Sequence, residues 1–191
     1  MYKEYLDSYK KEVTAAIEGI DPAGFEKIIE TLIAAYRADK QIIIMGNGGS
    51  AGTANHFVCD FGKNAVQDLT KRRFRILSVC DNVEKITAIG NDIAFEEIFR
   101  QQLINLLNPG DVVIAVSASG NSPNLVRACD YAAEKGAHVI ALAGFAGGKI
   151  SEYAEAGLIV PLTSYEQIED VHLVIMHMIV CFFKNHPECL G

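Results

Sequence analysis

The sequence predicts an α/β protein, a three-layer sandwich in which helices cover both faces of a five-stranded parallel sheet. Five short apolar runs alternate with segments of helical periodicity along the 191 residues, which is the pattern of repeated βαβ units. Two of these runs lead into loops rich in glycine or serine, at 46–50 and 117–122. Because ligands of parallel sheets bind beyond the carboxyl ends of the strands, we expect both loops at one ligand-binding edge.

The composition argues against several classes of protein. Half of the residues are hydrophobic and the net charge is −7, which does not suggest a nucleic-acid surface. The longest apolar stretch, 171–183, contains two histidines and is shorter than the ~20 residues of a membrane span. The charged start is unlike a signal peptide, and scattered cysteines without a C-x-x-C pair favour the reducing cytoplasm. No linker or repeat is visible, so we expect one domain over residues 1–191.

The first forty residues predict two helices ahead of the sheet. Residues 2–19 carry an apolar stripe, and Asp21-Pro22 marks the cap and first residue of a second helix with apolar positions up to Tyr36. No catalytic residue is visible in this segment. Because the apolar stripe is long for a surface helix, we expect residues 1–40 to contact another subunit.

The sheet and its helices follow in order. Strands are expected at 42–45, 74–80, 111–116, 138–143 and 158–162. Helices are expected from Ser50 onward, within 81–92, at 94–107, from Pro123 to Lys135 with Ser122 as N-cap, and at 165–184.

The first loop, Gly46-Asn47-Gly48-Gly49-Ser50, joins a strand to a helix start and predicts an anion site. Glycines let a ligand approach the backbone, and free N–H groups with the positive end of the helix dipole favour phosphate. On the following helix, His56 and Asp60 share a face, where they can bind metal or transfer protons. The alternative is the dinucleotide fingerprint G-x-G-x-x-A with Asp81 as its acid. However, Asp81 lies 35 residues after Gly46, and the fingerprint expects about 20.

The second loop places Ser117, Ser119 and Ser122 next to a helix start. Three hydroxyls and free N–H groups suit the three terminal oxygens of a phosphate monoester. The plainer interpretation is that Ser122 only caps the helix while the other two serines fill a turn. Because the glycine loop is expected at the same edge, we favour a phosphate site made by both loops.

The last helix adds His177, an imidazole among apolar residues, after an acidic start. A lone histidine on an apolar face usually packs in the core. Here Asp170 and Glu169 lie seven and eight residues earlier within a similar angular sector, so either carboxylate can accompany it. Periodicity alone slightly favours Asp170.

Four motifs occur in a fixed order along the chain: GNGGSAGTANHF, then GND at 90–92, SASGNSPN and QIEDVHLVIMH. Together they resemble the sugar isomerase (SIS) domain family and, within it, the phosphoheptose isomerases. The resemblance implies a flavodoxin-like five-stranded parallel sheet, a homotetramer and active sites at subunit boundaries. It also implies an aldose–ketose isomerase that converts sedoheptulose 7-phosphate to D-glycero-D-manno-heptose 7-phosphate through an enediol, for lipopolysaccharide or capsule heptose.

The resemblance also assigns roles to motif positions. Substrate contacts fall on Asn47, Gly48, Gly49, Ser50, Asp92, Ser117, Ser119, Ser122 and Glu169. A zinc site with one ion per subunit falls on His56, Asp60, Glu169 and His177, and Asp60 and His177 match the acid–base residues. The motif positions thus select Glu169 where periodicity slightly favours Asp170.

Several positions depart from the family pattern. Asp60 is one methylene shorter than the family glutamate, and Glu169 is charged where the family has glutamine. Ala118 replaces a threonine, and a family arginine falls near Lys63 and Asn64.

The alternative to an enzyme is a noncatalytic SIS-domain adaptor or a phosphosugar-binding regulator. Some such relatives lack the acid and the histidine. The presence here of His56, Asp60 and His177 favours the enzyme.

Overall fold

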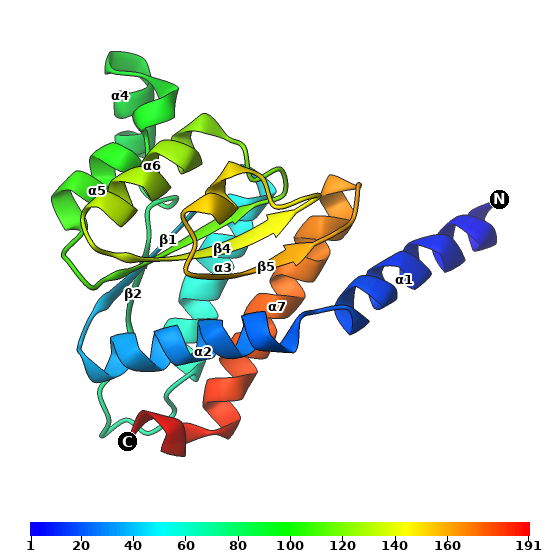
Figure 1. Cartoon of the computed structure of the whole chain (residues 1–191), viewed down its shortest axis with the longest axis horizontal. Helices are drawn as coiled ribbons and strands as arrows, with labels where there is room; N and C mark the ends of the chain where they lie inside the picture. The colour runs from blue at the N-terminus through cyan, green and yellow to red at the C-terminus, as the bar shows by residue number, and fades with distance from the viewer.

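The computed structural model describes residues 1–191 and shows a parallel five-stranded sheet between two layers of helices (Figure 1). The strands are β1 (Gln41–Gly46), β2 (Arg75–Ser78), β3 (Val112–Ser117), β4 (His138–Gly144) and β5 (Ala156–Val160). The α-helices are α1 (Tyr2–Glu18), α2 (Pro22–Arg37), α3 (Gly49–Asn64), α4 (Val83–Asp92), α5 (Arg100–Leu106), α6 (Pro123–Glu134) and α7 (Tyr165–Asn185). Short 3-10 helices are η1 (Phe95–Glu97), η2 (Lys149–Glu152) and η3 (Pro187–Leu190).

The strand order is β2-β1-β3-β4-β5, the flavodoxin-like order of doubly wound sheets. The predicted fold class is therefore confirmed. The order reverses between β1 and β3, which pair in parallel with Gly46 opposite Val116. The loops that follow β1 and β3 start next to each other and then lead in different directions. Open α/β sheets bind ligands at such a point, where the strand order reverses.

Alternate residues of each central strand supply the two hydrophobic cores. In β1, Ile42 and Ile44 pack with α2, α3 and α7, whereas Ile43 and Met45 pack with α5 and α6. All four side chains are fully buried. A strand that is buried on both faces carries a continuous apolar run rather than alternating residues, which is the pattern that predicted β1.

Helices α3 and α7 lie side by side on one face of the sheet, and an aromatic cluster fixes their relative position. Phe61 of α3 meets Phe183 of α7 with ring centroids 5.5 Å apart, and Phe74 contacts both rings at 4.4 and 5.1 Å. One to two turns earlier along both helices, the rings of His56 and His177 lie 5.0 Å apart. The packing of buried aromatics therefore determines which polar side chains of the two helices can meet.

One expected helix, 94–107, is broken in the structure. Residues 95–97 form η1, and α5 begins only at Arg100. Ile98 and Phe99 at the break are 2% and 1% exposed, because the turn directs them into the core against α6. Gln102 stabilises the break by donating to the carbonyls of Ile98 and Val79, both at 2.9 Å.

Other bounds shift by a few residues. β2 is shorter than 74–80, since Phe74 packs on the Tyr36 ring instead of extending the edge strand. The expected loop at the end of 81–92 is helical to Asp92, and Ile93 N donates to the Ile89 carbonyl at 3.0 Å to complete the last turn. At the other end, Asn82 caps α4 by accepting from Lys85 N at 2.8 Å. β5 ends at Val160, two residues earlier than expected.

The N-terminal helices form as predicted. Asp21 caps α2 by accepting from the backbone N–H groups of Ala23 and Gly24 at 3.2 and 2.9 Å. Helix α1 extends away from the body of the molecule (Figure 1) and leaves Tyr2 and Tyr5 exposed. No helix of the chain is both long enough and apolar enough to cross a membrane.

Candidate active site

A cavity of about 200 Å³ lies at the carboxyl ends of β1 and β3, where the strand order reverses. We call it the serine cup. Its lining consists of Asn47, Gly48, Gly49, Ser50, Val116, Ser117, Ala118, Ser119, Ser122, Tyr165 and Glu169. The structure therefore brings together every predicted substrate contact except Asp92.

The backbone of the first loop leaves donors available in the serine cup. Gly48 is the N-cap residue of α3 and has φ of 53°, a conformation that favours glycine. No side chain caps this helix. The backbone bonds to the loop carbonyls begin at Ala51 N and Gly52 N, so the N–H groups of Gly49 and Ser50 stay available to an anion.

The second loop supplies hydroxyls. Ser117 Oγ accepts from Gly120 N at 3.0 Å, and Ser119 Oγ accepts from Asn121 N at 3.3 Å, so both hydroxyl hydrogens remain free to donate. Ser122 occupies the N-cap position of α6 as predicted, but its side chain makes no capping bond. The structure thus gives no support to the plainer interpretation that Ser122 only caps the helix, and the residue lines the serine cup.

Asn124 ties the two loops together and was missed by the sequence analysis. Its amide donates to Asn47 Oδ1 at 3.0 Å, and the Asn47 amide donates back to Asn124 Oδ1 at 2.9 Å. Asn124 is 1% exposed and Asn47 is half-buried, and this reciprocal pair fixes the orientation of Asn47 at the edge of the serine cup. Its place in the SASGNSPN motif, one residue beyond the proline, was the available clue.

Tyr165, the first residue of α7, also lines the serine cup without having been predicted to do so. Its ring packs edge-on against Phe145 with centroids 5.3 Å apart. Phe145 has φ of 50°, so the turn after β4 holds it in the left-handed region, which few side chains adopt. A tyrosine at a helix start gave no distinguishing pattern in the sequence.

The predicted residues His56, Asp60 and His177 meet where α3 packs on α7. His56 Nε2 lies 3.1 Å from Asp60 Oδ2 and 3.2 Å from His177 Nε2, and His177 Nε2 lies 3.5 Å from Asp60 Oδ2. The Asn64 amide donates to the other carboxylate oxygen, Asp60 Oδ1, at 3.5 Å. We call these three residues the His–Asp–His cluster.

The His–Asp–His cluster fits a tetrahedral divalent metal ion. Ligand atoms ~2.0–2.2 Å from such an ion lie about 3.3 Å from one another. The three donor atoms here are separated by 3.1, 3.2 and 3.5 Å. Two imidazoles and one carboxylate are also a ligand set of catalytic zinc sites, in which the fourth position stays open. The structure therefore shows a possible metal-binding triad.

Glu169, the predicted fourth ligand, does not join the His–Asp–His cluster. Its carboxylate lies in the serine cup directly against Gly49, at the position that a Cβ of residue 49 would take. Burial raises the pKa of Glu169, and the nearby charges of Glu166 and Asp170 add to the rise. The prediction of a four-ligand site that includes Glu169 thus differs from the structure, because α7 directs this side chain to the start of α3.

Asp170, the companion of His177 that periodicity favours, also lies outside the cluster. Its Oδ2 accepts from Tyr9 Oη of α1 at 2.5 Å, and this bond raises the pKa of Tyr9 to about 12. Asp92 lies at the exposed end of α4, where its Oδ1 accepts from the Asn91 amide at 2.8 Å, and it does not line the serine cup. Within one chain, therefore, neither acid reaches the site.

Comparison with known proteins identifies the family of the chain. A family model described as the SIS domain matches residues 4–144. The phosphoheptose isomerase of Geobacter sp. strain M21 is 39% identical over 168 residues, which covers 88% of this chain and 86% of the relative. That of Shewanella denitrificans is 31% identical over 195 residues, covering 100% of this chain and 97% of the relative.

A solved structure of a phosphoheptose isomerase has the same fold as this chain. Phosphoheptose isomerase GmhA from Neisseria gonorrhoeae superimposes with a TM-score of 0.86 at 29% identity, covering 97% of this chain and 100% of that chain. The chain belongs to the SIS domain family. Within that family its relatives are phosphoheptose isomerases, and the chain is a phosphosugar isomerase.

Proposed function

We propose that this isomerase acts on a seven-carbon sugar phosphate and converts sedoheptulose 7-phosphate to D-glycero-D-manno-heptose 7-phosphate. The observation that carries the proposal is that the serine cup and the His–Asp–His cluster lie along one helix, α3. The cup begins at the start of this helix with Gly49, and the cluster begins at His56, seven residues later. The relatives' names point to the same substrate class.

The length of the helix between the two groups suits a heptose. Seven residues of α-helix rise ~10 Å. Seven bonds separate phosphorus from C2 in a heptose 7-phosphate, and an extended chain that advances ~1.3 Å per bond spans ~9 Å. A pentose 5-phosphate is shorter by ~2.6 Å on the same basis. A heptose bound by its phosphate in the serine cup therefore places C1 and C2 next to the cluster.

The serine cup is the phosphate anchor in this proposal. The hydroxyls of Ser117, Ser119 and Ser122 donate to the phosphate oxygens together with the N–H groups at the start of α3. Glu169 has only acceptor oxygens when ionised, so we assign it to a sugar hydroxyl rather than to phosphate or metal. Asp92 becomes a substrate contact only where α4 meets another subunit, since it is exposed in the single chain.

Isomerisation moves a proton from C1 of the ketose to C2 through an enediol. Asp60 Oδ2 faces both imidazoles. We therefore assign the other oxygen, Oδ1, to removal of the C1 proton and, after exchange of that proton with solvent, to delivery of a proton to C2. Positioned groups of this kind contribute typically about 10²–10⁴-fold in rate. His177 is the second acid–base residue: when its Nε2 carries no metal, it protonates the C2 carbonyl oxygen as the enediol forms and accepts the O1 proton as C1 becomes the carbonyl.

Zinc is the metal that we propose for the His–Asp–His cluster, held by His56 Nε2, Asp60 Oδ2 and His177 Nε2. When bound, it polarises a carbonyl or hydroxyl oxygen and stabilises the developing negative charge. Because Glu169 lies elsewhere, only one carboxylate offsets the charge of the ion. The site then keeps a net charge of about +1 and an open position for substrate oxygen.

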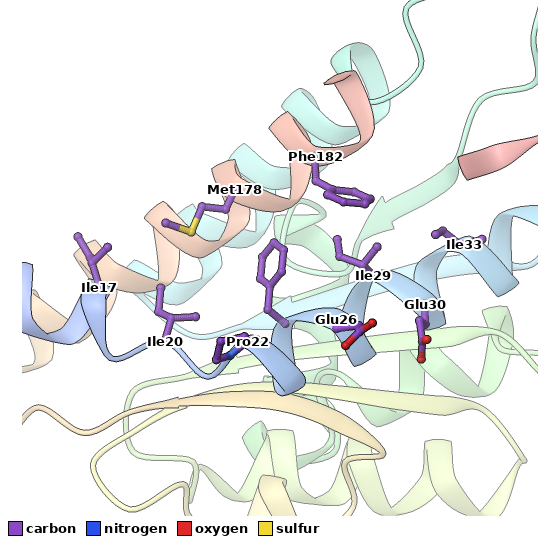
Figure 2. Close-up of a pocket in the computed structure, with 10 residues that line it drawn as sticks. Ile17, Ile20, Pro22, Glu26, Ile29, Glu30, Ile33, Met178 and Phe182 are labelled. Atoms are coloured by element: carbon purple, nitrogen blue, oxygen red, sulfur yellow. The ribbon is translucent and has the colours of Figure 1, made fainter. Parts of the chain in front are cut away.

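We also propose that the chain forms a homotetramer through residues 1–40 and α7. An apolar groove of about 560 Å³ runs between the α1–α2 corner and α7. Figure 2 shows Phe182 of α7 opposite Ile29 of α2 across this groove, with Met178 of α7 pointing toward the end where Ile17 and Ile20 lie. The groove continues into the exposed stripe of α1, so one copy of α1 can cover the groove of another. We further propose a cytoplasmic location, a reducing compartment in which the five free cysteines would stay reduced.

Product analysis tests the proposed reaction. The protein, loaded with zinc, is incubated with sedoheptulose 7-phosphate, and the products are followed by ¹³C NMR. We expect an aldoheptose 7-phosphate to accumulate to equilibrium, with ribose 5-phosphate turned over far more slowly. Tight binding of the heptose phosphate without any product contradicts the reaction and identifies a noncatalytic phosphosugar-binding protein.

A further inference from the structure

Gly52 is the fourth residue of α3, a position where the fold gives no reason for a glycine. Of the sixteen glycines in the chain, seven have a positive φ. Eight others have a neighbouring atom within 4 Å of the position that a Cβ would take, so a side chain would meet the protein there. Gly52 alone has neither property. Since glycine is unfavourable inside a helix, its presence at this position needs another explanation.

The position of Gly52 between the two parts of the active site offers one. Gly48, Gly52 and His56 are spaced four residues apart and therefore form one stripe along α3. Gly48 lines the serine cup, and His56 belongs to the His–Asp–His cluster. Gly52 N donates to the Gly48 carbonyl at 3.2 Å, so the helix passes this residue with ordinary geometry. The residue is exposed and the space beside its α-carbon is open.

We infer that Gly52 keeps the surface of α3 clear for the carbon chain of the sugar. A substrate that is anchored in the serine cup and reacts at the His–Asp–His cluster passes over this stripe. A Cβ extends ~1.5 Å from the α-carbon and displaces a sugar that lies against the helix. A misplacement of about 1 Å at the reacting atoms costs on the order of 100-fold in rate. Gly52 is thus a specificity-determining residue, and this inference rests on the proposed function.

If Gly52 has this role, Gly52→Ala should raise the stability of the protein and lower its activity. Replacing Gly52 by alanine removes the helix penalty of glycine without a clash in the protein. Thermal stability is therefore expected to rise, with Tm increasing by roughly 2–4 °C for a chain of this size. Turnover of the heptose phosphate is expected to fall, because the new methyl group occupies the path of the sugar.

A graded series with a matched control tests this. Gly52→Ala and Gly52→Leu add side chains of increasing size, and both new residues are good helix formers. Gly62→Ala makes the same backbone change in the same helix, where the added Cβ meets only Ile76 Cγ2 at an ordinary 3.4 Å. We expect kcat/KM to fall roughly 10–100-fold for Gly52→Ala and further for Gly52→Leu, and to stay unchanged for Gly62→Ala. Binding of inorganic phosphate should be the same in all four proteins.

Several results overturn the inference. Wild-type kcat/KM in Gly52→Leu shows that the sugar does not pass over the residue. An equal loss of inorganic phosphate binding shows damage to the serine cup, and a changed sedimentation coefficient shows that the glycine serves a subunit contact.

The same variants also show whether a failure lies in the role of Gly52 or in the proposed reaction. If the wild type binds sedoheptulose 7-phosphate without converting it, the reaction is wrong. Dissociation constants then decide the role of Gly52. A selective loss of heptose phosphate affinity in Gly52→Leu, relative to inorganic phosphate, supports the role, and equal affinities contradict it.

Discussion

His177 Nε2 lies 3.2 Å from His56 Nε2, although 121 residues separate the two histidines in the chain. Two imidazole nitrogens at this distance repel when both carry lone pairs or both carry protons. A shared proton or a bound cation relieves that repulsion. Asp60 Oδ2 lies within 3.5 Å of both nitrogens and completes a set of donors for a cation.

The first prediction concerns metal content. Wild-type protein is expected to retain about one zinc ion per chain after dialysis against a weak chelator. His56→Ala removes a direct ligand and should weaken binding by more than the ~10–100-fold that follows loss of an outer-shell partner. Glu169→Gln should leave metal content unchanged, because that carboxylate lies against Gly49 instead. Zinc loss in Glu169→Gln, with unchanged circular dichroism, restores the four-ligand hypothesis.

The second prediction concerns the phosphate anchor. Ser119→Ala should weaken binding of both the heptose phosphate and inorganic phosphate. A hydrogen bond to a charged group contributes roughly 1.5–3 kcal/mol, so the loss should be about 10–100-fold in each Kd. Ser8→Ala is the matched control, since Ser8 lies on α1 and donates to Glu12 at 3.0 Å. Calorimetric titration gives both constants, and unchanged affinities in Ser119→Ala remove the serine cup from phosphate binding.

The third prediction concerns pH and stability. His172 is fully buried, and neither ring nitrogen has a hydrogen-bond partner of normal geometry. Burial lowers its pKa from 6.5 to about 4, and the nearby Ala143 backbone offsets only part of this effect. Between those values the unfolded chain binds a proton that the folded chain does not. The free energy of unfolding is therefore complete above pH 6.5 and falls as the pH is lowered toward 4.

Urea denaturation at pH 7 and pH 5 measures this effect. Each unit of pKa difference corresponds to ~1.4 kcal/mol, so wild type should lose about 2 kcal/mol from this residue at pH 5. His172→Leu should lack that loss, whereas His186→Gln, which removes an exposed histidine, should retain it. An identical pH dependence in wild type and His172→Leu shows that His172 can protonate without unfolding.

The fourth prediction concerns assembly. Met178 is 37% exposed and lines the apolar groove, so Met178→Glu places a charge in the proposed subunit contact. We expect sedimentation to show a tetramer for wild type and smaller species for Met178→Glu at micromolar concentration. Leu69→Glu is the control, since Leu69 is 85% exposed outside the groove. A monomeric wild type contradicts the proposed assembly.

The parts of the site that local patterns define were predictable from sequence. The glycine and serine loops follow apolar strands directly, and His56 and Asp60 share one helical face. The position of His177 depends on how α7 packs against α3, which the buried pair Phe61 and Phe183 determines over a long separation in the chain. The motif resemblance supplied this contact, whereas periodicity could not.

The side-chain directions on α7 show the limit of periodicity. Glu169 and Asp170 are adjacent and fall in a similar sector relative to His177, yet one points into the serine cup and the other bonds to Tyr9 of α1. The positions of α1 and α3 around α7 determine which of these two side chains enters the serine cup. The Asn47–Asn124 pair was unpredictable for the same reason, because it joins two loops from different strands.

In the proposed reaction, Asp60 moves a proton between C1 and C2 of a heptose phosphate held in the serine cup. The most direct measurement is turnover of sedoheptulose 7-phosphate in D₂O, with NMR detection of deuterium at C2 of the aldose. We predict incorporation by wild type and a loss of about 10²–10⁴-fold in rate for Asp60→Asn, with inorganic phosphate binding unchanged. Wild-type rates of incorporation in Asp60→Asn would contradict this role of Asp60.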